Sequence, residues 1–100
     1  MLNLDPYTNA IAEICERLSI KRLEVFGSSL RDDFDTNASD IDFFYEFESA
    51  ENLFERFMSL KRELEELFGR KVDLLKEAQI QNPFIKEQIA NAPRKTLYAA

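Results

Sequence analysis

The sequence of 100 residues contains no histidine, no tryptophan and only one cysteine, Cys15. Without histidine, catalysis by Ser-His or Cys-His pairs and the usual histidine-containing zinc sites are excluded. A single cysteine cannot form an intrachain disulfide. Cys15 lies on the apolar side of a predicted helix, which indicates a small buried residue and not a nucleophile.

The sequence also lacks long apolar runs. No segment approaches the roughly 18 apolar residues that a membrane-spanning helix needs. The N-terminus has neither the charged start nor the apolar run of a signal peptide. We therefore expect a cytoplasmic protein with no membrane contact.

Positive charge is scarce, because 13 lysines and arginines face 19 aspartates and glutamates and leave a net charge of −6. Direct nucleic-acid binding is not expected, since it needs clustered basic residues. A metal-bridged small anion or a basic partner protein suits this charge better. A hydrophobic fraction of 45% is ordinary for a globular protein, and we expect one domain over residues 1–100. Nine phenylalanines predict a Phe-rich core.

Helix and strand patterns alternate along the chain, which predicts an α/β fold with helices packed on a sheet. Asp5 and Ser49 are the expected N-caps of the first and third helices. Phe84, Ile85 and Ile89 are the expected anchors of the last helix. The predicted helices are 5–18, 28–34, 49–68 and 83–92, and the predicted strands are 20–26, 40–47, 71–75 and a final piece at 95–100.

Two aspartates, Asp40 and Asp42, stand two residues apart in a predicted strand. This spacing sends both carboxylates out of the same face, about 7 Å apart. Like charges this close repel, and Mg²⁺, which binds carboxylate and phosphate oxygens, would remove the repulsion. The alternative is an acidic strand face that is open to water.

Asp73 lies in the later strand "KVDLL". If that strand pairs with 40–47, three carboxylates converge on one face. Such a group suits two divalent ions about 4 Å apart, which clamp the attacking and leaving oxygens of a displacement at phosphorus. The alternative for Asp73 is an edge-strand residue that faces water.

Gly27 ends a predicted strand just before a predicted helix. A glycine there lets the backbone turn sharply and approach a ligand. The N–H groups that follow, with the Ser28 and Ser29 hydroxyls, can hold a phosphate at the helix N-terminus. The alternative is an ordinary turn with a serine cap.

Together, "GSSLRDDFDTNASDID" and the downstream "KVDLL" resemble the G-S…D-x-D…D pattern of the polymerase-β-like nucleotidyltransferases. The short chain and its ending "NPFIKEQIANAPRKTLYAA" are most similar to the minimal (MNT) group. The resemblance covers about residues 20–98 and implies a small mixed sheet with helices packed mainly on one face. It implies that Gly27, Ser28, Ser29 and Arg31 bind the nucleotide. It also implies that Asp40, Asp42 and Asp73 are the catalytic and metal-binding residues, with Asp73 helping to activate the attacking hydroxyl.

The resemblance implies a Mg²⁺-dependent enzyme, using two ions, that transfers AMP from ATP to a hydroxyl. In the MNT group the protein is often an antitoxin, the partner a HEPN-type toxin and the acceptor a tyrosine of that toxin. A hetero-oligomer is therefore expected.

One residue departs from the family pattern Gly-Ser-x-x-Arg-Gly: Arg31 is present, but Asp32 stands where the second glycine is expected. Arg31 either neutralises phosphate or pairs with Asp32 or Asp35, and both readings stay open. Asp32 favours an alternative function, a non-catalytic antitoxin that neutralises its partner by binding. A third interpretation is a metal-binding domain that takes no nucleotide.

Overall fold

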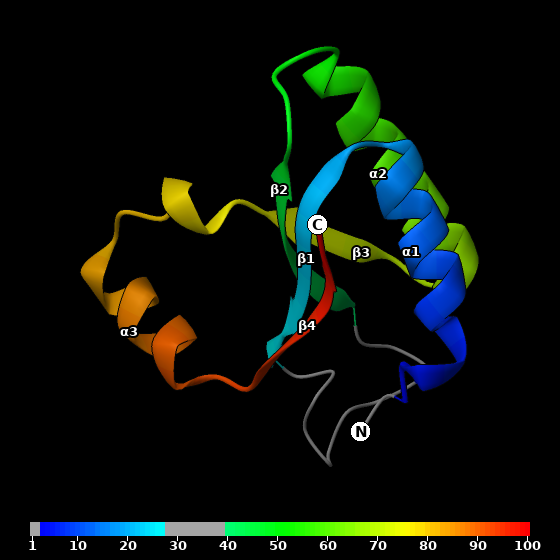
Figure 1. Ribbon diagram of the computed structural model, residues 1–100. Coiled ribbons are helices and arrows are strands. Elements are labelled where there is room, and N and C mark those ends of the chain that lie inside the picture. Colours follow the sequence, from blue (N-terminus) through cyan, green and yellow to red (C-terminus); the bar gives the residue numbers. More distant parts are fainter. Residues whose placement is uncertain (1–2, 28–39) are drawn as a thin grey trace.

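The computed structural model describes residues 3–27 and 40–100. The predicted helix at 28–34, together with Ser28, Ser29, Arg31 and Asp32, lies outside these residues. Within them, the helices and strands follow one another in the predicted order (Figure 1). The elements are η1 (Asp5–Tyr7), α1 (Thr8–Arg17), β1 (Ile20–Phe26), β2 (Ile41–Phe47), α2 (Leu53–Phe68), β3 (Val72–Leu75), η3 (Glu77–Gln79), α3 (Pro83–Asn91) and β4 (Arg94–Ala99).

The four strands form one mixed sheet in the order β3-β2-β1-β4. β1 pairs antiparallel with β2 and with β4, whereas β2 and β3 run parallel because α2 carries the chain back between them. The predicted small mixed sheet is therefore confirmed. No helix in the described part of the chain is long and apolar enough to cross a membrane.

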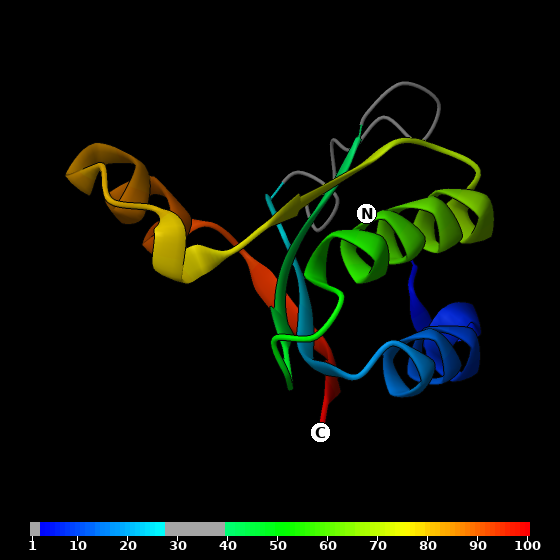
Figure 2. The same ribbon diagram turned by 90° about the horizontal axis from the view of Figure 1, so that it is seen from above.

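Helices α1 and α2 cover one face of the sheet, whereas α3 lies on the other side (Figures 1 and 2). Side chains alternate along a strand, so every second residue of β2 points to the helices. The core between the helices and the sheet comprises Leu4, Ile11, Ile14, Cys15, Ile20, Leu23, Val25, Ile41, Phe43, Tyr45, Leu60, Leu64 and Val72. We call the opposite side of the sheet the open face.

The core is less rich in phenylalanine than predicted. Isoleucine, leucine and valine supply most of it, and Phe43 is the one phenylalanine among its fully enclosed members. Phe26 and Phe44 are buried on the open face instead, with their rings stacked 4.0 Å apart. Phe54 and Phe84 are 76% and 66% exposed.

Both predicted N-caps are wrong. Asp5 begins the 3-10 turn η1, and α1 starts three residues later without a side-chain cap. Ser49 lies before a turn that delays α2 to Leu53, and its carbonyl and hydroxyl oxygens accept hydrogen bonds from Arg56. The predicted end of α2 was correct. Gly69 caps the helix at φ +67°, a conformation that favours glycine.

The predicted anchors of α3 are also wrong. Phe84 and Ile85 are exposed, and Ile89 is only half-buried. The reason is the position of α3 (Figure 2), which stands away from the sheet and buries no residue. Its N-terminus is nevertheless as predicted: Pro83 is the first residue, and the Asn82 side chain accepts a hydrogen bond from the Phe84 N–H.

Candidate active site

Two predicted site residues, Asp42 and Asp73, lie directly opposite each other on neighbouring strands. β2 pairs with β3 in a register that matches Asp42 with Asp73. Residues matched in this way point to the same side of the sheet, which here is the open face. The predicted pairing of the two strands is therefore confirmed, and it brings together carboxylates that are 31 residues apart in the sequence.

The setting of Asp42 raises its pKa from 3.8 to about 6. Burial contributes most, because it disfavours the charged form. The charge of Asp73, a hydrogen bond between the two carboxyl groups and the charge of Asp40 add to it. The sheet therefore holds the carboxyl groups of Asp42 and Asp73 together at a cost in free energy when both are charged.

Gly27 follows β1 and sits beside Asp42. Its φ of +82° is strained for any other residue, and a Cβ built on it would lie 3.5 Å from Asp42 Oδ2. The Gly27 N–H donates a hydrogen bond to the Pro93 carbonyl at 3.0 Å, which ties this turn to the end of the α3 segment. A substitution at position 27 would therefore strain the backbone beside Asp42.

Asp42 and Asp73 suit a Mg²⁺ site with two carboxylate ligands, and not a site in which protein ligands surround the ion. Among residues 3–27 and 40–100, no three acidic side chains lie close enough together to hold a metal ion. Mg²⁺ is usually held by one or two carboxylates together with substrate phosphates and water, which Asp42 and Asp73 could provide. Asp40 is exposed, just before β2 begins, and its role as a ligand stays a prediction.

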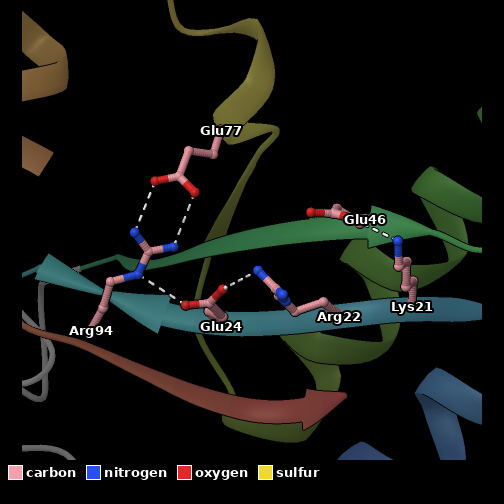
Figure 3. Close-up of polar contacts among 6 residues, drawn as sticks. All are labelled: Lys21, Arg22, Glu24, Glu46, Glu77 and Arg94. Atoms are coloured by element: carbon pink, nitrogen blue, oxygen red, sulfur yellow. Dashed lines mark hydrogen bonds and ion pairs between the residues drawn. The ribbon is translucent and has the colours of Figure 1, made fainter. Parts of the chain in front are cut away.

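The open face also carries an ion-pair network that none of the predicted site residues belongs to (Figure 3). Glu24 is buried, with 6% of its surface exposed, and accepts a hydrogen bond from Arg94 at 2.9 Å. Arg94 also forms two hydrogen bonds with Glu77, at 2.8 and 3.2 Å. Hydrogen bonding to Arg94 lowers the pKa of Glu77. An acidic residue between Leu23 and Val25 in a predicted strand was the signal that could have identified Glu24.

The open face is hollowed next to this network. A cavity of about 510 Å³ is lined by Phe44, Phe47, Leu53 and Lys76, among others. Phe44 is two residues after Asp42 in β2 and therefore points to the same face. Most of the surface that lines the cavity is apolar, although six of the lining residues are charged. Such a cavity can admit a side chain of another protein on the same face of the sheet as the carboxylate pair.

A mixed sheet that sets paired carboxylates beside a glycine turn is the arrangement that the sequence motif predicted for a nucleotidyltransferase. Comparison with known proteins gives the same class. The family model described as "Nucleotidyltransferase domain" matches residues 8–95. The chain therefore belongs to this family.

A relative from Methanocaldococcus jannaschii, provisionally named a protein adenylyltransferase, is 34% identical over 90 residues, which is 90% of this chain and 94% of the relative. A solved structure of a provisionally named minimal nucleotidyltransferase superposes with a TM-score of 0.62 at 32% identity and covers 90% of each chain.

A solved complex of a tri-AMPylated HEPN toxin from Shewanella oneidensis with an MNT antitoxin also matches. Its TM-score is 0.60 at 17% identity, over 98% of this chain and 74% of that chain. At this identity the likeness shows the fold.

Proposed function

We propose that this chain is a Mg²⁺-dependent nucleotidyltransferase that transfers AMP from ATP to a hydroxyl of a partner protein, and that it acts as an antitoxin. The observation that carries the proposal is the pairing of Asp42 with Asp73 beside the Gly27 turn. The family match and the relative named a protein adenylyltransferase support it.

The proposed reaction is a displacement at the α-phosphorus of ATP. The hydroxyl oxygen of the acceptor forms a bond to that phosphorus, the bond to the bridging oxygen of the β-phosphate breaks, and pyrophosphate leaves. Bound Mg²⁺ would neutralise the phosphate oxygens and polarise the phosphorus. Asp42 and Asp73 would hold the two ions together with Asp40, and Asp73 would accept the proton of the hydroxyl. Gly27 with Ser28, Ser29 and Arg31 would bind the phosphates.

The acceptor would reach Asp73 from the open face, the face on which the cavity lined by Phe44 lies. We infer that the acceptor is a tyrosine of a HEPN-type toxin, with which the chain forms a hetero-oligomer in the cytoplasm. The matched complex of a tri-AMPylated HEPN toxin with an MNT antitoxin motivates this partner. The apolar lining of the cavity suits an aromatic side chain that carries a hydroxyl.

The proposal is tested by measuring the transfer of label from α-³²P-ATP to the protein that the neighbouring gene encodes. We expect labelling of the partner that needs Mg²⁺ and disappears in Asp42→Asn. Glu66→Gln, an exposed acid on α2, is the control and should label the partner normally. If the two proteins bind each other but no label is transferred, the enzymatic function is wrong.

A second candidate is an antitoxin that neutralises its partner by binding alone. It is favoured because Asp32 replaces a glycine of the family pattern. The double substitution Asp40→Ala with Asp42→Ala separates the two candidates. Full neutralisation by this variant would favour binding alone, whereas its loss with binding intact would favour catalysis.

A further inference from the structure

A second cavity lies at the other end of the site, between the Gly27 turn and α3. Its volume is about 540 Å³, and it is lined by Phe26, Gly27, Gln88, Ile89, Asn91 and Ala92. Its size is within the range of about 300 to 1,000 Å³ that is typical of small-molecule sites. Because Gly27 lines it, the cavity opens beside the proposed phosphate site, so a nucleotide held there could place its base in it.

The chemistry of the lining is that of a base site. Phe26, Ile89 and Ala92 supply apolar surface, and the turn at Gly27 brings backbone without a side chain. Gln88 and Asn91 are three residues apart on α3 and therefore project from the same side of the helix. Both side chains are exposed, and no hydrogen bond within the described residues uses their amide groups.

We propose that Gln88 and Asn91 recognise the base of the bound nucleotide and select adenine. This inference rests on the proposed nucleotidyltransferase function. A side-chain amide presents one donor and one acceptor next to each other. Adenine presents the complementary pair, its amino group and an adjacent ring nitrogen, and Asn or Gln is the usual partner of that pair. On the edge of the ring that carries N7, guanine instead presents two acceptors, which arginine or lysine reads, and neither residue lines the cavity.

The inference also explains an unusual feature of α3. The helix has nine residues and buries none, although isolated helices of fewer than about 12 residues are marginal in water. Two contacts hold the segment on either side of α3: the Pro93 carbonyl accepts the Gly27 N–H, and Arg94 binds Glu77. A base between α3 and Phe26 would give the helix the packing that it lacks.

Binding measurements test this inference without relying on turnover. Affinities for ATP, GTP, CTP, UTP and inorganic tripolyphosphate, each with Mg²⁺, are measured by calorimetry for the unmodified protein and for Gln88→Ala/Asn91→Ala. We expect the unmodified protein to prefer ATP by roughly tenfold to a hundredfold. The double variant should lose this preference and keep its affinity for tripolyphosphate.

Glu87→Ala is the matched control, because position 87 is on the same helix but does not line the cavity. It should keep the ATP preference. Alanine favours helix more than either amide residue does, so loss of α3 would not explain the result, and circular dichroism of all variants checks this.

Equal binding of all four nucleotides by the unmodified protein, or an undiminished ATP preference in the double variant, would overturn the inference alone. Failure of the unmodified protein to bind both ATP and tripolyphosphate would overturn the proposed function and this inference with it.

Discussion

The substitution Asp42→Asn is expected to stabilise the metal-free protein while it removes the proposed activity. Asp42 has a pKa of about 6 in the folded chain and 3.8 as an ordinary carboxyl. The folded state therefore binds its proton more tightly than the unfolded state does. The stability that this proton provides is complete below about pH 4 and is lost as the pH rises through 6.

The magnitude follows from the shift in pKa. A difference of about two units corresponds to about 3 kcal/mol, and partial exposure of Asp42 reduces this to about 1 to 2 kcal/mol. Asparagine has nearly the same shape and carries no charge. In EDTA at pH 7.5, Asp42→Asn should therefore raise the free energy of unfolding by that amount, which is a rise in Tm of about 5 to 10 °C.

Thermal unfolding at several pH values measures the effect. The gain should disappear near pH 4, where the wild-type carboxyl is protonated. Mg²⁺ should stabilise the wild type more than the variant, because a ligand of the folded state adds to its stability. Glu66→Gln should change stability by less than about 0.5 kcal/mol at every pH. A variant that is less stable at pH 7.5, or a gain that does not depend on pH, would refute the reasoning.

Three further predictions concern the rest of the chain. Arg56→Ala should lower the free energy of unfolding, measured in urea, by about 2 to 4 kcal/mol. The reason is that the guanidinium donates hydrogen bonds to the carbonyls of Leu18, Ser19, Ser49 and Glu51. A loss below about 0.5 kcal/mol would contradict this. Arg94→Ala should cost about 2 to 3 kcal/mol, because buried Glu24 loses its closer partner. Adding Glu24→Gln should recover part of this loss, and purely additive losses would show that the pair is not coupled. Cys15 is fully buried, and burial raises the pKa of its thiol to about 12. It should therefore resist a thiol reagent at pH 8 until denaturant is added. Rapid reaction of the native protein would show that the helix opens locally.

Much of the local structure could be predicted from the sequence. The strand at Ile20–Phe26 has the predicted bounds, and β2 and β3 each begin one residue later than predicted. The period of two was enough to place Asp42 on the side of its strand opposite Ile41 and Phe43, whereas Asp40 lies just before β2 begins. The caps were less predictable, because whether Asp5 or Ser49 caps a helix depends on how the turn before it packs.

The composition of the site could not be predicted completely. Arg94 and Glu24 are 70 residues apart in the sequence, and only the pairing of β4 with β1 brings them together. The amides of α3 could not be placed either, because the apolar residues Phe84 and Ile85 suggested a helix packed on the sheet. Their exposure shows that a local apolar pattern does not say which surface covers it.

The sequence by itself therefore determined the class of fold, the nucleotidyltransferase family and the side of the strand on which Asp42 lies. These properties follow from local periodicity and from a short motif. Only the tertiary structure decided that Asp73 lies opposite Asp42, that Glu24 is buried against Arg94 and that α3 stands beside the Gly27 turn. Strand order and register follow from burying one face of every strand at once, and that condition depends on the whole chain.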